Sequence, residues 1–256
     1  MSTTHLPPAA RRTLGLARAN ALLMRRNVVT LLYAVAVSLL PLALLAFGSG
    51  RAATTSAIAN ALLMAALFPV YYNILSLTVT RRDELVLKRL RTGEARDREI
   101  LASIALPGLA VMAVVVVLTV ALALVLSDQA PVNAPLIAVT AVLLGATFSA
   151  LAVWTAAWTR NAEAAQLTSM PVIALAVVGS VRPVLPESWR QWVDLTPGGA
   201  LDQLVRLAWY GENENGATLD LLGSTLAATG PVLVLLAWTA ISVTLVRRGM
   251  RWEPRS

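Results

Sequence analysis

The sequence predicts an all-α membrane protein that crosses the bilayer with six helices. Hydrophobic residues make up 57% of the 256 residues and charged residues only 14%, whereas a soluble domain is roughly 45–50% apolar and about 25% charged. Uncharged runs along the chain reach the roughly 20 residues that a helix needs to cross a bilayer core about 30 Å thick. These runs are continuous, which is typical of helices, because strands of a membrane barrel alternate apolar and polar residues. The whole chain, residues 1–256, is predicted to form one transmembrane domain.

The segment 9–27 precedes the first apolar run and is predicted to be an amphipathic helix lying in the membrane interface. Arg11, Arg18 and Arg25 are seven residues apart, so they share one helical face. Another face carries small and apolar residues, namely Leu14, Ala17, Ala21 and Leu22. A helix of this kind buries its apolar face at the boundary between headgroups and acyl chains. The alternative is a basic topology signal without fixed structure.

Six segments are predicted to span the bilayer: residues 28–47, 57–79, 100–126, 135–159, 164–182 and 221–246. The fifth differs from the others because its uncharged run covers only residues 167–181. It reaches full length only if the side chain of Arg182 extends to the interface from membrane depth. Prolines lie within several spans, where we expect them to kink the helices or to act as hinges in a gating motion. They are Pro41, Pro69, Pro107, Pro171 and Pro231.

The basic residues predict which side of the membrane each loop occupies. All but four of the 21 Lys and Arg residues lie in the leader, in the loops after the second and fourth spans, or in the tail. Cytoplasmic loops carry an excess of Lys and Arg, so both termini are predicted to be cytoplasmic. We therefore expect the positive net charge of +7 to interact with anionic lipid headgroups and cytosolic partners, and we expect no nucleic-acid partner. Arginine almost entirely replaces lysine, as in GC-rich bacterial genomes, so we expect a bacterial plasma membrane.

The sequence offers little for catalysis or metal binding. It has no cysteine and a single histidine, His5, which argues against thiolate, zinc and histidine-based sites. The spans carry no ionisable residue in their middles, where proton- or ion-coupled transporters need one. No phosphate-binding Gly-x-x-x-x-Gly-Lys-Ser/Thr loop occurs either. The chain is therefore predicted not to be an enzyme, to hold no metal or cofactor, and to receive energy from another polypeptide.

Uncharged polar residues inside the spans have two interpretations. They can hydrogen-bond to neighbouring helices, or they can line the path of a transported compound. The candidates for such a path are Asn60, Tyr72, Asn73, Thr147 and Thr155. The surrounding Ala, Leu and Val residues favour a hydrophobic or amphipathic compound such as a drug, a natural product or a lipid.

The loop 80–99 is the largest internal cytoplasmic segment and is predicted to contain a short amphipathic helix. Glu84 and Lys88 have the spacing of a favourable i,i+4 pair, and Gly93 suits the end of a helix. Leu85, Val86 and Leu90 form a small apolar face. The segment is longer than a connector between two helices needs to be, which favours a docking helix over a solvated connector.

The segment 183–210 is predicted to form two short re-entrant or interfacial helices on the outer side, between the last two spans. Trp189, Trp192 and Trp209 suit the headgroup level, where indole rings are enriched. Asp202 and Arg206 are spaced as an i,i+4 pair. One helical face is apolar and consists of Leu201, Leu204, Val205 and Ala208. The alternative is an ordinary extracellular loop with anchoring aromatic residues.

Three segments together resemble the type-2 ABC transporter permeases. The run LKRLRTG at residues 87–93 is similar to the coupling-helix segment that follows the second span in that family. The run RNAEAAQ at residues 160–166, followed by Pro171, is similar to the junction between spans four and five. The outer segment 183–210 is similar to the family's segment between the last two spans. The match covers nearly the whole chain in order and spacing.

The resemblance implies a permease half of an ATP-driven exporter. Two permease chains, identical or different, would pair with two ABC ATPase subunits, and ATP and magnesium would bind only to those partners. The contact with the ATPase would be made by Glu84, Leu87, Lys88, Arg89 and Leu90. Two other functions compatible with the composition are a non-transporting membrane sensor or immunity protein and, more remotely, a membrane-embedded enzyme that modifies lipids.

Overall fold

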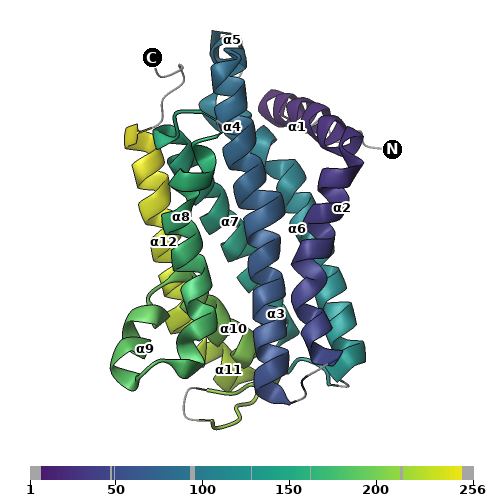
Figure 1. Cartoon of the computed structure of the whole chain (residues 1–256), viewed down its shortest axis with the longest axis vertical. Helices are drawn as coiled ribbons and strands as arrows, with labels where there is room; N and C mark the ends of the chain where they lie inside the picture. The colour runs from purple at the N-terminus through teal and green to yellow at the C-terminus, as the bar shows by residue number, and fades with distance from the viewer. Residues whose placement is uncertain are drawn as a thin grey trace.

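The computed structural model describes residues 7–46, 48, 50–92, 96–127, 129–161, 163–213 and 216–249. Within these ranges the chain is a bundle of helices (Figure 1), and the only extended pairing is an isolated antiparallel bridge between Glu212 and Thr218. The predicted all-α class is therefore confirmed. The end of the docking segment at Gly93 and the single histidine, His5, lie outside the described residues.

The helices follow one another along the chain in this order: α1 (Pro8–Arg26), α2 (Val28–Leu39), η1 (Leu40–Ala46), α3 (Arg51–Ala65), η2 (Ala66–Tyr72), α4 (Asn73–Asp83), α5 (Val86–Thr92), α6 (Asp97–Ser127), α7 (Ala134–Trp158), α8 (Ala165–Val177), η3 (Val178–Val184), α9 (Glu187–Asp194), α10 (Pro197–Tyr210), α11 (Leu221–Ala227) and α12 (Thr229–Gly249). Segments η1 and η3 are 3₁₀ helices and η2 is a π-helix.

Five helical segments of the described chain are long and apolar enough to cross a membrane, and a bent pair of helices can supply a sixth. The five are Arg51–Asp83, Asp97–Ser127, Ala134–Trp158, Ala165–Arg182 and Thr229–Gly249. The bent pair consists of Ala9–Arg26 and Leu31–Leu45, whose directions differ by 81°. Helix α1 thus lies across one end of the bundle while α2 runs along it, as Figure 1 shows.

The structure divides the last predicted span, 221–246, into two helices. The short helix α11 ends at Ala227, and α12 begins at Thr229. Pro231 explains the division, because a proline has no N–H to donate to the carbonyl four residues earlier, here that of Ala227. Only α12 has the length and hydropathy of a membrane span. Within the predicted segment 221–246 the membrane-spanning helix is therefore α12, and α11 is a separate short helix before it.

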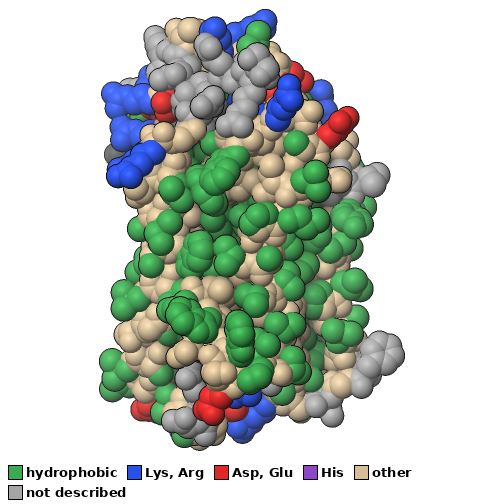
Figure 2. All heavy atoms as spheres, turned by 60° about the vertical axis from the view of Figure 1, so that its left-hand side comes forward, with side chains coloured by type: hydrophobic (Ala, Val, Ile, Leu, Met, Phe, Trp, Pro, Cys, Tyr) green, Lys and Arg blue, Asp and Glu red, His purple; other side chains and the backbone are tan. Residues whose placement is uncertain are grey.

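The two ends of the bundle differ in charge. Helices α1 and α5 and the C-terminal end of α12 lie at one end, which we call the basic end, while α9, α10 and α11 lie at the opposite end (Figure 1). Figure 2 shows Lys and Arg side chains gathered at the basic end and apolar side chains around the middle. Large apolar residues of this middle zone are exposed, including Val114, Val117 and Val142. An exposed apolar belt between polar ends is what a lipid-facing surface requires, so the chain is a multi-pass membrane protein.

Helix α10 is packed inside the opposite end of the bundle. It contacts α3, α7 and α12 as well as η3, and the whole predicted apolar face of this helix is buried. The side chain of Trp209 is 0% exposed, whereas Trp189 and Trp192 are 63% and 64% exposed. Trp209 therefore packs within the fold and does not face lipid headgroups, because other helices cover its side of α10.

The kink expected at Pro69 takes the form of the π-helical segment η2. A proline ring clashes with the carbonyl one turn earlier in a regular α-helix, and a wider turn relieves that clash. Gly108 of α6 lies directly against the carbonyl of Pro69. The absence of a side chain at Gly108 therefore allows α6 to approach the backbone of η2.

Candidate functional site

The short helix α5 projects beyond the other helices at the basic end, carried by α4 and α6 (Figure 1). The turn between α4 and α5 consists of Glu84 and Leu85, and Leu85 has a left-handed φ of 59°. Left-handed residues commonly end helices, but in a residue other than glycine this conformation costs about 1–2 kcal/mol. Glu84 and Lys88 consequently do not share a helix, since α5 begins at Val86.

The residues predicted to contact an ATPase divide into two groups. Glu84, Lys88 and Arg89 are exposed. Leu87 is fully buried, and Leu90 packs against the core with part of its surface exposed. The two leucines therefore fasten α5 to its own chain, while the three charged residues lie on the surface that a partner would meet.

Helix α1 is bonded to both helices that carry α5. Arg12 donates from Nε and Nη2 to Glu99 Oε2 and Oε1 of α6, at 3.1 and 3.3 Å. The buried Asn20 donates to the backbone carbonyl of Ser103 in α6 at 2.7 Å, and its Oδ1 accepts from Arg81 of α4. These bonds connect α1 to the last turn of α4 and to the first turns of α6.

The sequence did not identify Arg12 and Asn20 as the residues that bond α1 to the other helices. Of the residues predicted for the apolar face of α1, Ala17 is buried, but Leu14 and Leu22 remain 49% and 51% exposed. The face that packs on the bundle runs through Ala17 and Asn20, which are three residues apart and hence neighbours on a helix. The exposed leucines suit a helix in the interface, where they would reach the acyl chains.

We expect Arg12→Gln to loosen α1 from the bundle, because it removes both charge-assisted hydrogen bonds to Glu99. Hydrogen bonds between charged groups are stronger than those between neutral groups, so the melting temperature should fall and backbone amides of α1 should exchange faster with solvent. Arg11→Gln is the matched control, since Arg11 is exposed on the same helix. Equal exchange rates in the two variants would contradict the assigned role of Arg12.

Arg82 joins the end of α4 to the end of α7. Its side chain is 1% exposed, and Nη1 donates to the carbonyl of Ala156 at 2.8 Å. Nη2 donates to the carbonyls of Thr159 and Arg160 at 2.5 and 3.2 Å. The last carbonyls of a helix have no partner within the helix, and a cation at that end also opposes the helix dipole. Arg82 therefore caps α7 from a different helix.

Two of the predicted path residues, Thr147 and Thr155, are buried and hold α7 against other helices. Thr155 Oγ1 accepts from the hydroxyl of Tyr71 in η2 at 3.1 Å. Thr147 Oγ1 lies 2.7 Å from Thr239 Oγ1 of α12. Their positions fit interhelical hydrogen bonding, which was the alternative interpretation of these residues.

The other three path candidates lie on a partly exposed strip along α3, η2 and α4. Asn60, Tyr72 and Asn73 are all partly exposed, but the amide nitrogen of Asn73 is buried beside Gly108 of α6 and has no hydrogen-bond partner among the described residues. The hydroxyl of Tyr72 lies 3.4 Å from Ser169 Oγ of α8, and its ring is 5.8 Å from that of Phe68. In Figure 1 the helices that carry this strip run between α2 and α8. We call it the polar–aromatic strip.

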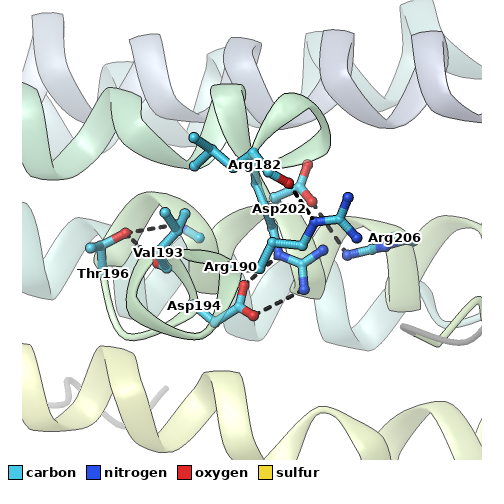
Figure 3. Close-up of polar contacts among 9 residues, drawn as sticks. Arg182, Arg190, Val193, Asp194, Thr196, Asp202 and Arg206 are labelled. Atoms are coloured by element: carbon cyan, nitrogen blue, oxygen red, sulfur yellow. Dashed lines mark hydrogen bonds and ion pairs between the residues drawn. The ribbon is translucent and has the colours of Figure 1, made fainter. Parts of the chain in front are cut away.

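A charged cluster braces the helices at the opposite end (Figure 3). Arg182 donates from Nε and Nη2 to Asp194 Oδ1 and Oδ2, at 2.5 and 2.9 Å. The predicted pair of Asp202 and Arg206 is confirmed at 3.4 Å. The sequence led us to expect that the side chain of Arg182 extends to the membrane interface. Instead, Arg182 is only 8% exposed, because its charge is paired with Asp194 of α9 within the fold.

Asp202 is the carboxylate of this cluster most affected by its surroundings. Burial raises the pKa of the Asp202 carboxyl above its ordinary value, and the positive charges of Arg206 and Arg182 offset only part of that effect. The cluster joins η3, α9 and α10 to one another. Among the described residues, no three His, Asp or Glu side chains gather as ligands of a metal ion would.

The fold and the two ends define a class of protein, a helical multi-pass membrane protein with a short helix projecting from its basic end. The family model described as ABC-2 type transporter matches residues 11–197, most of the chain. The chain therefore belongs to the ABC-2 type transporter family and is a membrane-spanning transport subunit of a kind that generally works with an ATPase subunit. No curated protein matches the chain.

Proposed function

We propose that the chain is the permease subunit of an ATP-driven ABC exporter in a bacterial plasma membrane, with the basic end in the cytoplasm. The family match supports the transport role, and the excess of basic residues at one end favours this orientation. The projecting helix α5 is the single feature that carries the proposal, because it offers a separate ATPase subunit a surface to hold. ATP and magnesium bind to that partner, of which two copies serve two permease chains.

Movement of the ATPase subunits reaches the bundle through α5 and its supports. Glu84, Lys88 and Arg89 contact the ATPase, and Leu87 holds α5 to its own chain. Displacement of α5 pulls on α4 and α6 together. The bonds of Arg82 carry that displacement to α7, and the contacts of Arg12 carry it to α1. The hydrogen bonds that join these helices keep the end of the bundle moving as a unit.

The transported compound moves along the polar–aromatic strip, which a second permease chain, identical or different, would face. The strip combines amide and hydroxyl groups with aromatic rings, at Asn60, Phe68, Tyr72 and Asn73. It carries no charged side chain between Asn60 and Ser76. Such a surface favours a hydrophobic or amphipathic compound, moved out of the cell, over an inorganic ion.

The combined substitution Lys88→Glu with Arg89→Glu tests the coupling surface. It places two negative charges on the exposed part of α5, so capture of the ATPase subunit should weaken at least about tenfold. Co-expression of the chain with its ATPase, copurification and measurement of ATP hydrolysis by the complex give the readout. The melting temperature of the isolated permease should stay unchanged, because both side chains are exposed.

Arg248→Glu is the matched control, since Arg248 is exposed at the basic end on α12 and lies away from α5. It should leave capture of the ATPase intact. Two results would overturn the proposal: full ATPase capture by the double variant, or energy-dependent transport by the purified permease without an ATPase.

A further inference from the structure

A cavity of about 580 Å³ opens between α6, α7 and α12 near the basic end. This volume is in the range of sites that hold small organic ligands. Its walls are mainly apolar and include Leu101, Ala105, Val153, Val243 and Val246, with the buried hydroxyl of Ser149 among them. The cavity does not include the polar–aromatic strip or α5, so neither the proposed transport path nor the proposed ATPase contact accounts for it.

Two arginines stand at the rim of this cavity. Arg98 lies in the first turn of α6 and Arg247 in the last turn of α12, and both are exposed. Neither forms an ion pair with any residue that the structure describes. Asp97 lies at the same rim and has an interaction of its own. The rim therefore carries an excess of positive charge, contributed by two different helices.

The charge and the apolar surface occupy different depths. Ala105 follows Arg98 by seven residues, which is about 10 Å along a helix. On α12, Val246 and Val243 likewise lie deeper in the bundle than Arg247. A ligand that fills the cavity must carry a negative group at the rim and an apolar chain below it. A free phosphate or a charged peptide would leave the apolar walls uncovered.

We propose that this cavity binds an anionic phospholipid of the cytoplasmic leaflet, with the phosphate between Arg98 and Arg247 and an acyl chain against the walls. Basic pockets between transmembrane helices on the cytoplasmic side favour such headgroups. The bound lipid fills the space between α6 and the C-terminal end of α12 and so stabilises the position of that end. The site requires the bilayer but neither the ATPase nor transport.

Lipid retention by the purified full-length permease tests the proposal. The protein is exchanged into nanodiscs of phosphatidylcholine that contain phosphatidylglycerol with the same acyl chains, then released and weighed by native mass spectrometry. We expect phosphatidylglycerol to remain bound in preference to phosphatidylcholine. Arg98→Gln with Arg247→Gln should weaken retention about 25-fold, since each basic residue near an anionic surface contributes about fivefold.

Two further variants separate the parts of the site. Arg248→Gln removes an exposed arginine next to Arg247 that does not line the cavity, and it should retain the lipid. Ala105→Leu fills the wall and should reduce retention while leaving both arginines in place. Melting temperatures in phosphatidylcholine alone show whether each variant is folded.

Several outcomes would overturn the proposal. Equal retention of the two lipids would show ordinary annular contact, and equal losses in Arg248→Gln and the double variant would show diffuse charge attraction. A rise in the melting temperature with inorganic phosphate as large as the rise with phosphatidylglycerol would exclude a role for the acyl chain. If the double variant kept its lipid but lost the ATPase subunit, the rim would be a protein contact. The choice of the cytoplasmic leaflet rests on the proposed orientation, but the lipid-retention readouts use the permease alone, so they stay valid if the exporter assignment fails.

Discussion

Gly108→Ala should strongly destabilise the bundle. A Cβ at this position would lie 2.0 Å from the carbonyl oxygen of Pro69 and 3.0 Å from its carbonyl carbon. These are backbone atoms of the π-helical segment and cannot rotate away as a side chain can, so α6 or η2 must move. Overpacking of a well-packed core destabilises a protein by about 1–3 kcal/mol and occasionally more. Because the clash here is with backbone atoms, we expect the destabilisation by Gly108→Ala to reach or exceed the upper end of that range.

The yield of monodisperse protein and its melting temperature measure this effect. Gly15→Ala and Gly230→Ala are matched controls, because a Cβ at either helical glycine meets nothing within 4 Å. Alanine is favoured over glycine in a helix by about 1 kcal/mol, so both controls should be as stable as the parent chain or more so. A Gly108→Ala protein as stable as these controls would show that α6 does not touch the carbonyl of Pro69.

Arg82→Met should be the most damaging substitution of a charged residue at the basic end. The side chain of methionine has similar length but no hydrogen-bond donor. The carbonyls of Ala156, Thr159 and Arg160 therefore lose the hydrogen bonds that they accept from Arg82. Leaving a buried polar group without a partner costs about 1–3 kcal/mol, and several groups are affected together. We expect a loss of about 3–5 kcal/mol, seen as a large drop in melting temperature and as rapid amide exchange at the end of α7.

Two comparisons separate the role of Arg82 from loss of charge alone. Arg82→Lys keeps the charge but cannot reproduce the planar fork of donors, so its stability should lie between those of the parent and the methionine variant. Arg18→Met removes an exposed arginine of α1 and should be almost without effect. Indistinguishable stabilities of Arg82→Met and Arg18→Met would exclude the cap on α7.

The spans could be recognised from the sequence because crossing a bilayer imposes a length and an apolar composition. Residues 100–126 were expected to form a helix, and α6 extends over Asp97–Ser127. Residues 135–159 correspond in the same way to α7, Ala134–Trp158. Both predictions depend only on local sequence, since a backbone in hydrocarbon must satisfy its own hydrogen bonds. The pairing of Asp202 with Arg206 was also predictable, because both residues lie on one helix.

Contacts between distant segments could not be recognised in this way. Arg81 and Arg82 are adjacent and chemically identical, yet one bonds Asn20 of α1 and the other caps α7. Trp209 and Trp192 have the same amphipathic chemistry, but only Trp209 is covered by other helices. No periodicity distinguishes the members of these pairs, because the difference lies in which helix packs beside each residue.

For this protein, local sequence was sufficient to determine that the chain is helical, that it belongs in a membrane and where its basic residues concentrate. Only the tertiary structure decided that α1 is bonded to both supports of α5, that α10 is buried, and that Arg98 and Arg247 meet at one cavity. The physical reason is that hydrophobic length and charge are properties of single segments. Burial, capping and cavities arise from the packing of segments that lie far apart in the sequence.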